Sequence, residues 1–110
     1  MTAKYPYRGQ KIPPSVRCLG LVYKVILVDD VGMLLALGRK PEAWGATDYS
    51  NMQILLLEDQ SDERMWLTFC HEVAHVLADA SGLVMDASEE TAEKLERPLA
   101  SLLAENDWTQ

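Results

Sequence analysis

The segment His71-Glu72-Val73-Ala74-His75 holds both histidines of this chain and has the spacing of a metal-binding helix. On an α-helix, side chains four positions apart lie on one face, so the imidazoles of His71 and His75 can bind one ion. Glu72 points about 100° away from His71 around the helix, which suits a carboxylate that acts as a general base without binding the metal. The pattern HExxH therefore predicts a zinc site with Glu72 as the catalytic residue. The alternative is a helix with two ordinary surface histidines.

A catalytic zinc ion typically has three protein ligands, so His71 and His75 need a partner. The segment after the HExxH pattern offers Glu89, Glu90, Glu93 and Glu96. Glu96 borders the apolar stripe of that segment and is the predicted third metal ligand. Glu93 lies about 60° further toward solvent and is the alternative. We interpret Glu89, Glu90 and Glu93 as a solvated helix face.

The residues before the HExxH pattern predict strands. Apolar side chains alternate over residues 15–28, which predicts one long or bent strand with Gly20 as a possible bulge. Residues 45–49 and 52–57 flank a Ser-Asn turn and predict a hairpin. Residues 31–44 fit a short helix or a packed loop. Together these elements predict a three-stranded antiparallel sheet, with the segment Met52–Leu57 at its edge.

Two helices should complete an α+β fold. Ser61 predicts the N-cap of the HExxH helix, which should run to about Ser81 with Gly82 as a left-handed cap. The last helix should begin near Asp86 or Ser88, and Pro98 predicts a kink or restart near Glu96. One apolar stripe of the HExxH helix should lie on the sheet, and it comprises Trp66, Phe69, Cys70, Val73, Leu77 and Ala80.

The length of 110 residues and the hydrophobic content of 48% predict a single domain over residues 15–110, preceded by an extended or flexible arm over residues 1–14. The sequence has neither an apolar run long enough for a membrane span nor the apolar region of a signal peptide. A cytoplasmic location is therefore expected. Cys18 and Cys70 are too few for a disulfide framework and should be buried free thiols.

The net charge of −7 is unevenly distributed, because residues 1–57 carry a net +3 and residues 58–110 a net −10. An acidic helical half repels phosphate groups, which argues against nucleic acid as a partner. A protein or peptide substrate is the expected partner, no membrane is involved, and the oligomeric state stays open.

The chain resembles small gluzincin-type metallopeptidases of the ImmA/IrrE family, especially the minimal versions of phages and prophages. The resemblance covers roughly residues 20–105. Its signatures are Tyr23-Lys24-Val25, Val28-Asp29-Asp30, Trp44-Gly45-Ala46-Thr47-Asp48-Tyr49, Glu63-Arg64, Leu67-Thr68, the HExxH segment and Leu95-Glu96-Arg97.

The resemblance implies a minimal zincin-like fold in which a small sheet packs on the HExxH helix and a C-terminal helix. It also implies zinc held by His71, His75 and the glutamate that matches Glu96, with Glu72 activating water. Longer relatives cleave transcriptional repressors. The chain departs from the family at Pro98 and at Ala100, where relatives often carry a polar residue that would orient the ligand.

The predicted function is that of a zinc-dependent peptidase, possibly acting on a regulatory protein. An extended substrate would add to the sheet edge at Met52–Leu57 through main-chain hydrogen bonds. The alternative function is a noncatalytic, zinc-containing binding module that acts on a host or regulatory protein through its acidic helical face.

Overall fold

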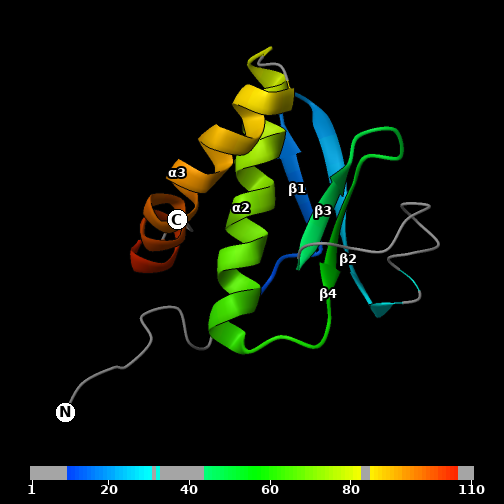
Figure 1. The fold of residues 1–110 in the computed structure, drawn as a ribbon, viewed down its shortest axis with the longest axis vertical. Coiled ribbons are helices and arrows are strands. Elements are labelled where there is room, and N and C mark those ends of the chain that lie inside the picture. The colour runs from blue at the N-terminus through cyan, green and yellow to red at the C-terminus, as the bar shows by residue number, and fades with distance from the viewer. Residues whose placement is uncertain (1–9, 31, 33–43, 83–84, 107–110) are drawn as a thin grey trace.

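The computed structural model describes residues 10–30, 32, 44–82 and 85–106 and shows an α+β fold. Figure 1 shows helix α2 lying between a sheet and helix α3. The segment 31–44, apart from Gly32 and Trp44, lies outside the described residues, as do residues 1–9 of the predicted arm and Trp108. The α+β class is confirmed, and the strand arrangement differs from the prediction.

The predicted long first strand is two strands joined by a tight turn. Strand β1 (Ser15–Cys18) pairs antiparallel with strand β2 (Leu21–Val28), with Cys18 opposite Leu21. Leu19 and Gly20 form the turn with φ values of 51° and 83°. Two successive positive φ values are the geometry of a type I′ hairpin turn, whose twist matches that of the flanking strands. Gly20 therefore makes a hairpin and not a bulge.

The sheet has four strands in the order β1-β2-β4-β3 and is mixed. Strand β3 (Gly45–Asp48) pairs antiparallel with strand β4 (Gln53–Leu57), which confirms the predicted hairpin. Strand β4 also pairs with β2, and this pairing is parallel. The predicted three-stranded, fully antiparallel sheet is therefore wrong.

The prediction that Met52–Leu57 forms the sheet edge is also wrong, because β4 is an inner strand. Ile54, Leu55 and Leu56 are all buried, at 0–2% exposure. A continuous buried run of this kind is typical of a strand covered on both faces. The outer strand beside β4 is the short β3, whose residues are all half-buried.

Helix α2 (Asp62–Ala80) has the predicted ends. The Ser61 side chain accepts a hydrogen bond from the Arg64 backbone N–H at 3.2 Å, so it caps the helix start. Gly82 follows the helix with a φ of 83°, and its N–H donates to the Asp79 carbonyl at 3.0 Å. Both ends of α2 are therefore set by local residues.

Helix α3 (Met85–Glu105) continues through Pro98 as one helix, so it does not restart near Glu96. It runs antiparallel to α2 (Figure 1), and two of its alanines, Ala92 and Ala100, are fully buried. Trp66 was expected on the sheet side of α2, but its Nε1 donates to the Ala100 carbonyl on α3 at 3.0 Å. The small side chains let the two helices approach closely.

The contact between α2 and β3 depends on a glycine. A Cβ atom on Gly45 would lie 2.7 Å from Thr68 Cγ2 and 2.9 Å from the Leu55 carbonyl oxygen. No side chain fits at these distances without a shift of strand or helix. Gly45 therefore allows β3 to lie close against the helix that carries the HExxH pattern.

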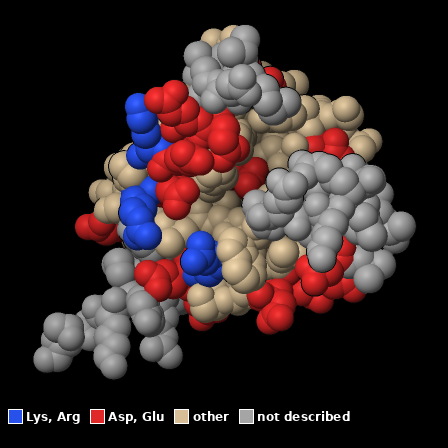
Figure 2. Space-filling view, viewed as in Figure 1, with Lys and Arg blue, Asp and Glu red and all other residues tan. Residues whose placement is uncertain are grey.

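Acidic side chains gather over the first part of α3, as Figure 2 shows. Of the two cysteines, Cys70 is buried as expected and Cys18 is half-buried, and neither forms a disulfide. Burial raises the pKa of the Cys70 thiol to about 12. Among the described helices, none has the length and apolar character needed to cross a lipid bilayer.

Replacing Gly45 with alanine is expected to lower the free energy of unfolding by about 1–3 kcal/mol, because the added methyl group overpacks the contact with Thr68 and Leu55. Chemical denaturation measures this change. Adding Thr68→Ser removes Cγ2 and should restore part of the loss. An unchanged free energy of unfolding in Gly45→Ala would show that β3 is not held this close to α2.

Candidate metal centre

The two histidines of α2 and a glutamate of α3 converge on one point. Glu89 Oε1 lies 3.1 Å from His71 Nε2, and Glu89 Oε2 lies 3.0 Å from His75 Nε2. One ligand atom from each of the three residues lies within 4.8 Å of the others. An imidazole nitrogen pair and a carboxylate at such separations can hold a metal ion, and they are the donors that zinc sites use.

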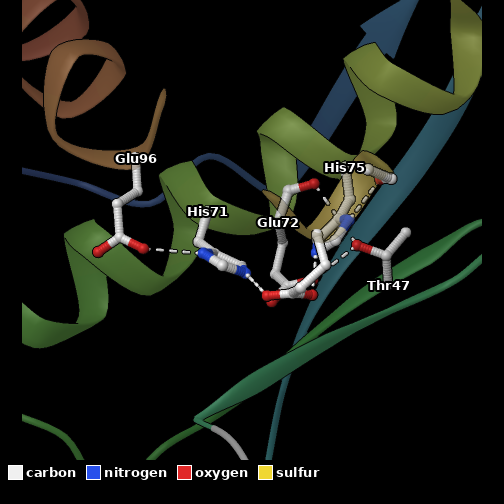
Figure 3. Close-up of polar contacts among 7 residues, drawn as sticks. Thr47, His71, Glu72, His75 and Glu96 are labelled. Carbon is white, nitrogen blue, oxygen red and sulfur yellow. Dashed lines mark hydrogen bonds and ion pairs between the residues drawn. The ribbon is translucent and has the colours of Figure 1, made fainter. Parts of the chain in front are cut away.

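The other nitrogen of each imidazole also has a partner from α3. His71 Nδ1 lies 2.8 Å from Glu96 Oε1, and His75 Nδ1 lies 2.7 Å from Ser88 Oγ. In Figure 3, Glu96 approaches His71 from one side and Thr47 approaches Glu72 from the other. Metal-binding histidines commonly donate their second N–H to a carboxylate or another oxygen, which fixes the ring orientation. Both rings therefore have Nε2 directed at the shared point.

His71 lies between two carboxylates, since Glu96 faces Nδ1 and Glu89 faces Nε2. An ionised carboxylate only accepts hydrogen bonds, so a neutral imidazole with one N–H satisfies only one of them. The second contact needs either a proton on Nε2 or a cation in its place. The donor set therefore fits a metal ion bound at Nε2, with the Nδ1 proton held by Glu96.

The acidic surroundings affect the two histidines differently. Burial lowers the pKa of His71, but the hydrogen bond with Glu96 and the charges of Glu72 and Glu89 outweigh burial, so the pKa is raised overall. Burial lowers the pKa of His75, which favours its neutral form. A neutral imidazole is the form that binds metal. A metal ion would therefore meet a neutral imidazole at His75 and would displace a proton from His71.

Glu72 is 5% exposed and lies on the side of α2 that faces β3. Its Oε1 accepts a hydrogen bond from the Thr47 hydroxyl at 2.8 Å. Burial raises the pKa of Glu72 to about 7, and the Thr47 hydrogen bond and the charge of His71 oppose the rise. A carboxyl group with a pKa near neutrality can both take and return a proton.

The structure brings His71 and His75 together as the sequence predicts, and it places Glu89 with them where Glu96 was expected. Glu89 was interpreted as part of a solvated face, and its side chain is 54% exposed although both its oxygens face the histidines. Metal binding by Glu96 stays a prediction, and its observed contact is with Nδ1 of His71. Glu93 is exposed.

Sequence reasoning missed three residues of the site: Thr47, Ser88 and Glu89. A signal for Glu89 was present, because Glu89, Ala92 and Glu96 share one helix face at spacings of three and four. In a helical hairpin, residues equally far from the connection face each other, which places Ser88 and Glu89 near His75. Thr47 had no comparable signal, since its contact with Glu72 depends on how β3 pairs.

Comparison with protein-family models gives a match. The family model described as IrrE N-terminal-like domain, Peptidase_M78, matches residues 35–104, which is more than half of the chain. The matched segment contains β3, β4 and α2 and nearly all of α3, and so every residue of the site. Neither a curated protein nor a solved structure matches the chain.

Alanine substitutions at Glu89, Glu96 and Glu93 should separate a ligand from an orienting residue. Glu89→Ala should bind Zn²⁺ more weakly and shift the visible bands of the Co²⁺-loaded protein, because a directly bound oxygen is removed. Glu96→Ala should keep the Co²⁺ band positions and weaken Zn²⁺ binding roughly 10-fold to 100-fold. Glu93→Ala serves as the control and should match the wild type.

Zn²⁺ affinity is measured by competition with a chromophoric chelator. A changed Co²⁺ spectrum in Glu96→Ala, with an unchanged one in Glu89→Ala, would make Glu96 the third ligand as the sequence predicted.

Proposed function

Because this chain belongs to the family of IrrE N-terminal-like domains, Peptidase_M78, we propose that it is a zinc-dependent peptidase. The observation that carries the proposal is the position of Glu72. Its carboxyl group is buried on the helix that carries both histidines, and it is close enough to His71 and Glu89 for their charges to affect its pKa. A metal site that is only structural needs no general base beside it.

His71, His75 and Glu89 are the residues proposed to hold the ion. When bound there, zinc would supply a Lewis acid that polarises a peptide carbonyl and makes water more acidic. Glu96 keeps the Nδ1 proton of His71 in place, and Ser88 does the same for His75. The ring orientation of both ligands is thereby fixed before any metal binds.

Glu72 performs the proton transfers. It accepts a proton from the attacking water and returns it to the amine of the leaving peptide. The nearly complete burial of Glu72 excludes bulk water from its carboxylate. The hydrogen bond from Thr47 occupies one oxygen and leaves the other for the reacting water.

An extended peptide is the proposed substrate, and β3 is the proposed strand for it to join. Strand β3 ends the sheet order and lies against α2 at Glu72. Addition of a strand to an open edge provides main-chain hydrogen bonds that do not depend on sequence. Three further points remain predictions: that the substrate is a regulatory protein, that the location is cytoplasmic, and that the origin is a phage or prophage.

A noncatalytic binding module is the second candidate. The acidic side chains over α3 favour it, since Glu90 is 69% exposed and Glu89 is 54% exposed. Such a surface suits a basic protein partner. This candidate needs the metal site for stability and does not need Glu72.

Replacing Glu72 with glutamine should abolish cleavage and leave zinc binding intact, because the amide cannot accept a proton from water. We expect cleavage of a quenched fluorescent peptide library by the zinc-loaded protein to fall at least about 100-fold. Zinc content is measured on the same samples by elemental mass spectrometry. Glu90→Gln makes the same change of charge at an exposed position and should cleave like the wild type.

Wild-type cleavage by Glu72→Gln would remove the peptidase proposal. A wild-type protein that binds one zinc ion but cleaves no peptide in the library would favour the binding module. His75→Ala should have no zinc, and full zinc content in that variant would contradict the proposed site.

A further inference from the structure

Thr47 contacts the proposed general base from the sheet. Its hydroxyl donates to Glu72 Oε1 at 2.8 Å and lies 3.5 Å from the Glu72 backbone carbonyl. Among the described residues, no other side chain donates a hydrogen bond to the Glu72 carboxylate. A threonine hydroxyl has a single proton, so this bond fixes one carboxylate oxygen and leaves the second unengaged.

The backbone N–H and C=O groups of Thr47 point away from the rest of the sheet. Leu57 N–H donates to the Trp44 carbonyl at 2.9 Å, so Trp44 directs its main-chain groups toward β4. In an antiparallel strand these directions alternate, so Ala46 and Asp48 also face β4, whereas Gly45 and Thr47 face outward. The strand register agrees with this direction. Thr47 lies opposite Ile54, and the backbone N–H and C=O of Ile54 face β2 on the other side of β4.

The outward N–H and C=O of Thr47 lie at the end of the sheet order, where no described strand pairs with them. A peptide that extends the sheet would therefore form hydrogen bonds with Thr47 itself. The side chain of the same residue reaches the buried Glu72 on α2. One residue thus lies in contact with both the proposed substrate strand and the proposed base.

We propose that Thr47 is a positioning residue that aligns Glu72 with the bound peptide. The inference rests on the proposed peptidase function and adds to it. The hydroxyl of Thr47 holds the Glu72 carboxylate in one rotamer, and its main chain sets the register of the substrate strand. Thr47 then positions both the reacting peptide bond and the Glu72 carboxylate. A small shift of β3 therefore moves the two together.

The close contact of β3 with α2 supports this role. Gly45, two residues before Thr47, leaves no room for a side chain against Thr68. Thr68 lies one helical turn before Glu72 on α2, and its own hydroxyl donates to Gln60 Oε1 at 2.9 Å. Strand β3 is therefore packed tightly on α2 at Gly45 and hydrogen-bonded to Glu72 at Thr47.

The test compares Thr47→Val, which keeps the shape and removes the hydroxyl, with Thr47→Ser, which keeps the hydroxyl. Thr68→Val is the matched control, because it removes a neighbouring hydroxyl of the same interface that does not touch Glu72. The probe is the quenched fluorescent peptide that the wild-type protein cleaves fastest. The side-chain carboxyl ¹³C resonance of Glu72, assigned with Glu72→Gln, is recorded at one fixed pH.

Thr47→Val should lower kcat roughly 10-fold to 100-fold with little change in KM, and should shift the Glu72 resonance while Zn²⁺ affinity stays unchanged. Thr47→Ser should restore most of kcat and the original resonance. Thr68→Val should leave kcat and the resonance close to wild type.

Wild-type kcat in Thr47→Val, or an unmoved Glu72 resonance, would overturn the role of Thr47 and leave the peptidase proposal standing. An equal loss of kcat in Thr68→Val would also overturn it, because the effect would then belong to the interface as a whole. If the wild-type protein cleaves no peptide, the peptidase function fails and this inference fails with it.

Discussion

The packing of α3 against α2 is the interaction on which the rest of the site depends. Ala92 and Ala100 are fully buried and allow the two helices to approach closely. The approach places Ser88, Glu89 and Glu96 against the histidines of α2. Charged groups brought together in this way are stable only if their hydrogen-bonding and charge requirements are met. The position of His71 between two carboxylates is the clearest case, because a positive charge at Nε2 is needed to satisfy both.

The sheet acts on the opposite side of the same helix. Strand β3 contacts α2 at Gly45 and Thr47, and the Thr47 hydroxyl donates a hydrogen bond to the Glu72 carboxylate. Helix α2 therefore receives the partners of its two histidines from α3 and the hydrogen-bond partner of Glu72 from the sheet. The buried inner strand β4 holds β3 in place, and its unbroken apolar run explains why so short an outer strand is stable.

Local features were predictable from the sequence and long-range pairings were not. The caps at Ser61 and Gly82 follow from side-chain and backbone preferences of single residues. The parallel pairing of β2 with β4 depends on a long connection, which hydrophobic alternation does not encode. The third-ligand prediction relied on the apolar stripe of α3, but Leu95 in that stripe is 37% exposed, whereas Ala92 and Ala100 are fully buried. This orientation of the helix brings Glu89 to the histidines as well as Glu96.

The two helices of the site are joined by a short connection. Because their side chains converge on one point, metal binding at that point would depend on the docking of α3 on α2. A cation held by His71 and His75 of α2 and Glu89 of α3 would bind the docked hairpin and not the separated helices. By mass action, binding then shifts the folding equilibrium toward the docked form. Without the cation, the charge of Glu89 close to the buried Glu72 opposes docking. The metal affinity of the site and the free energy of docking α3 on α2 would therefore be thermodynamically linked.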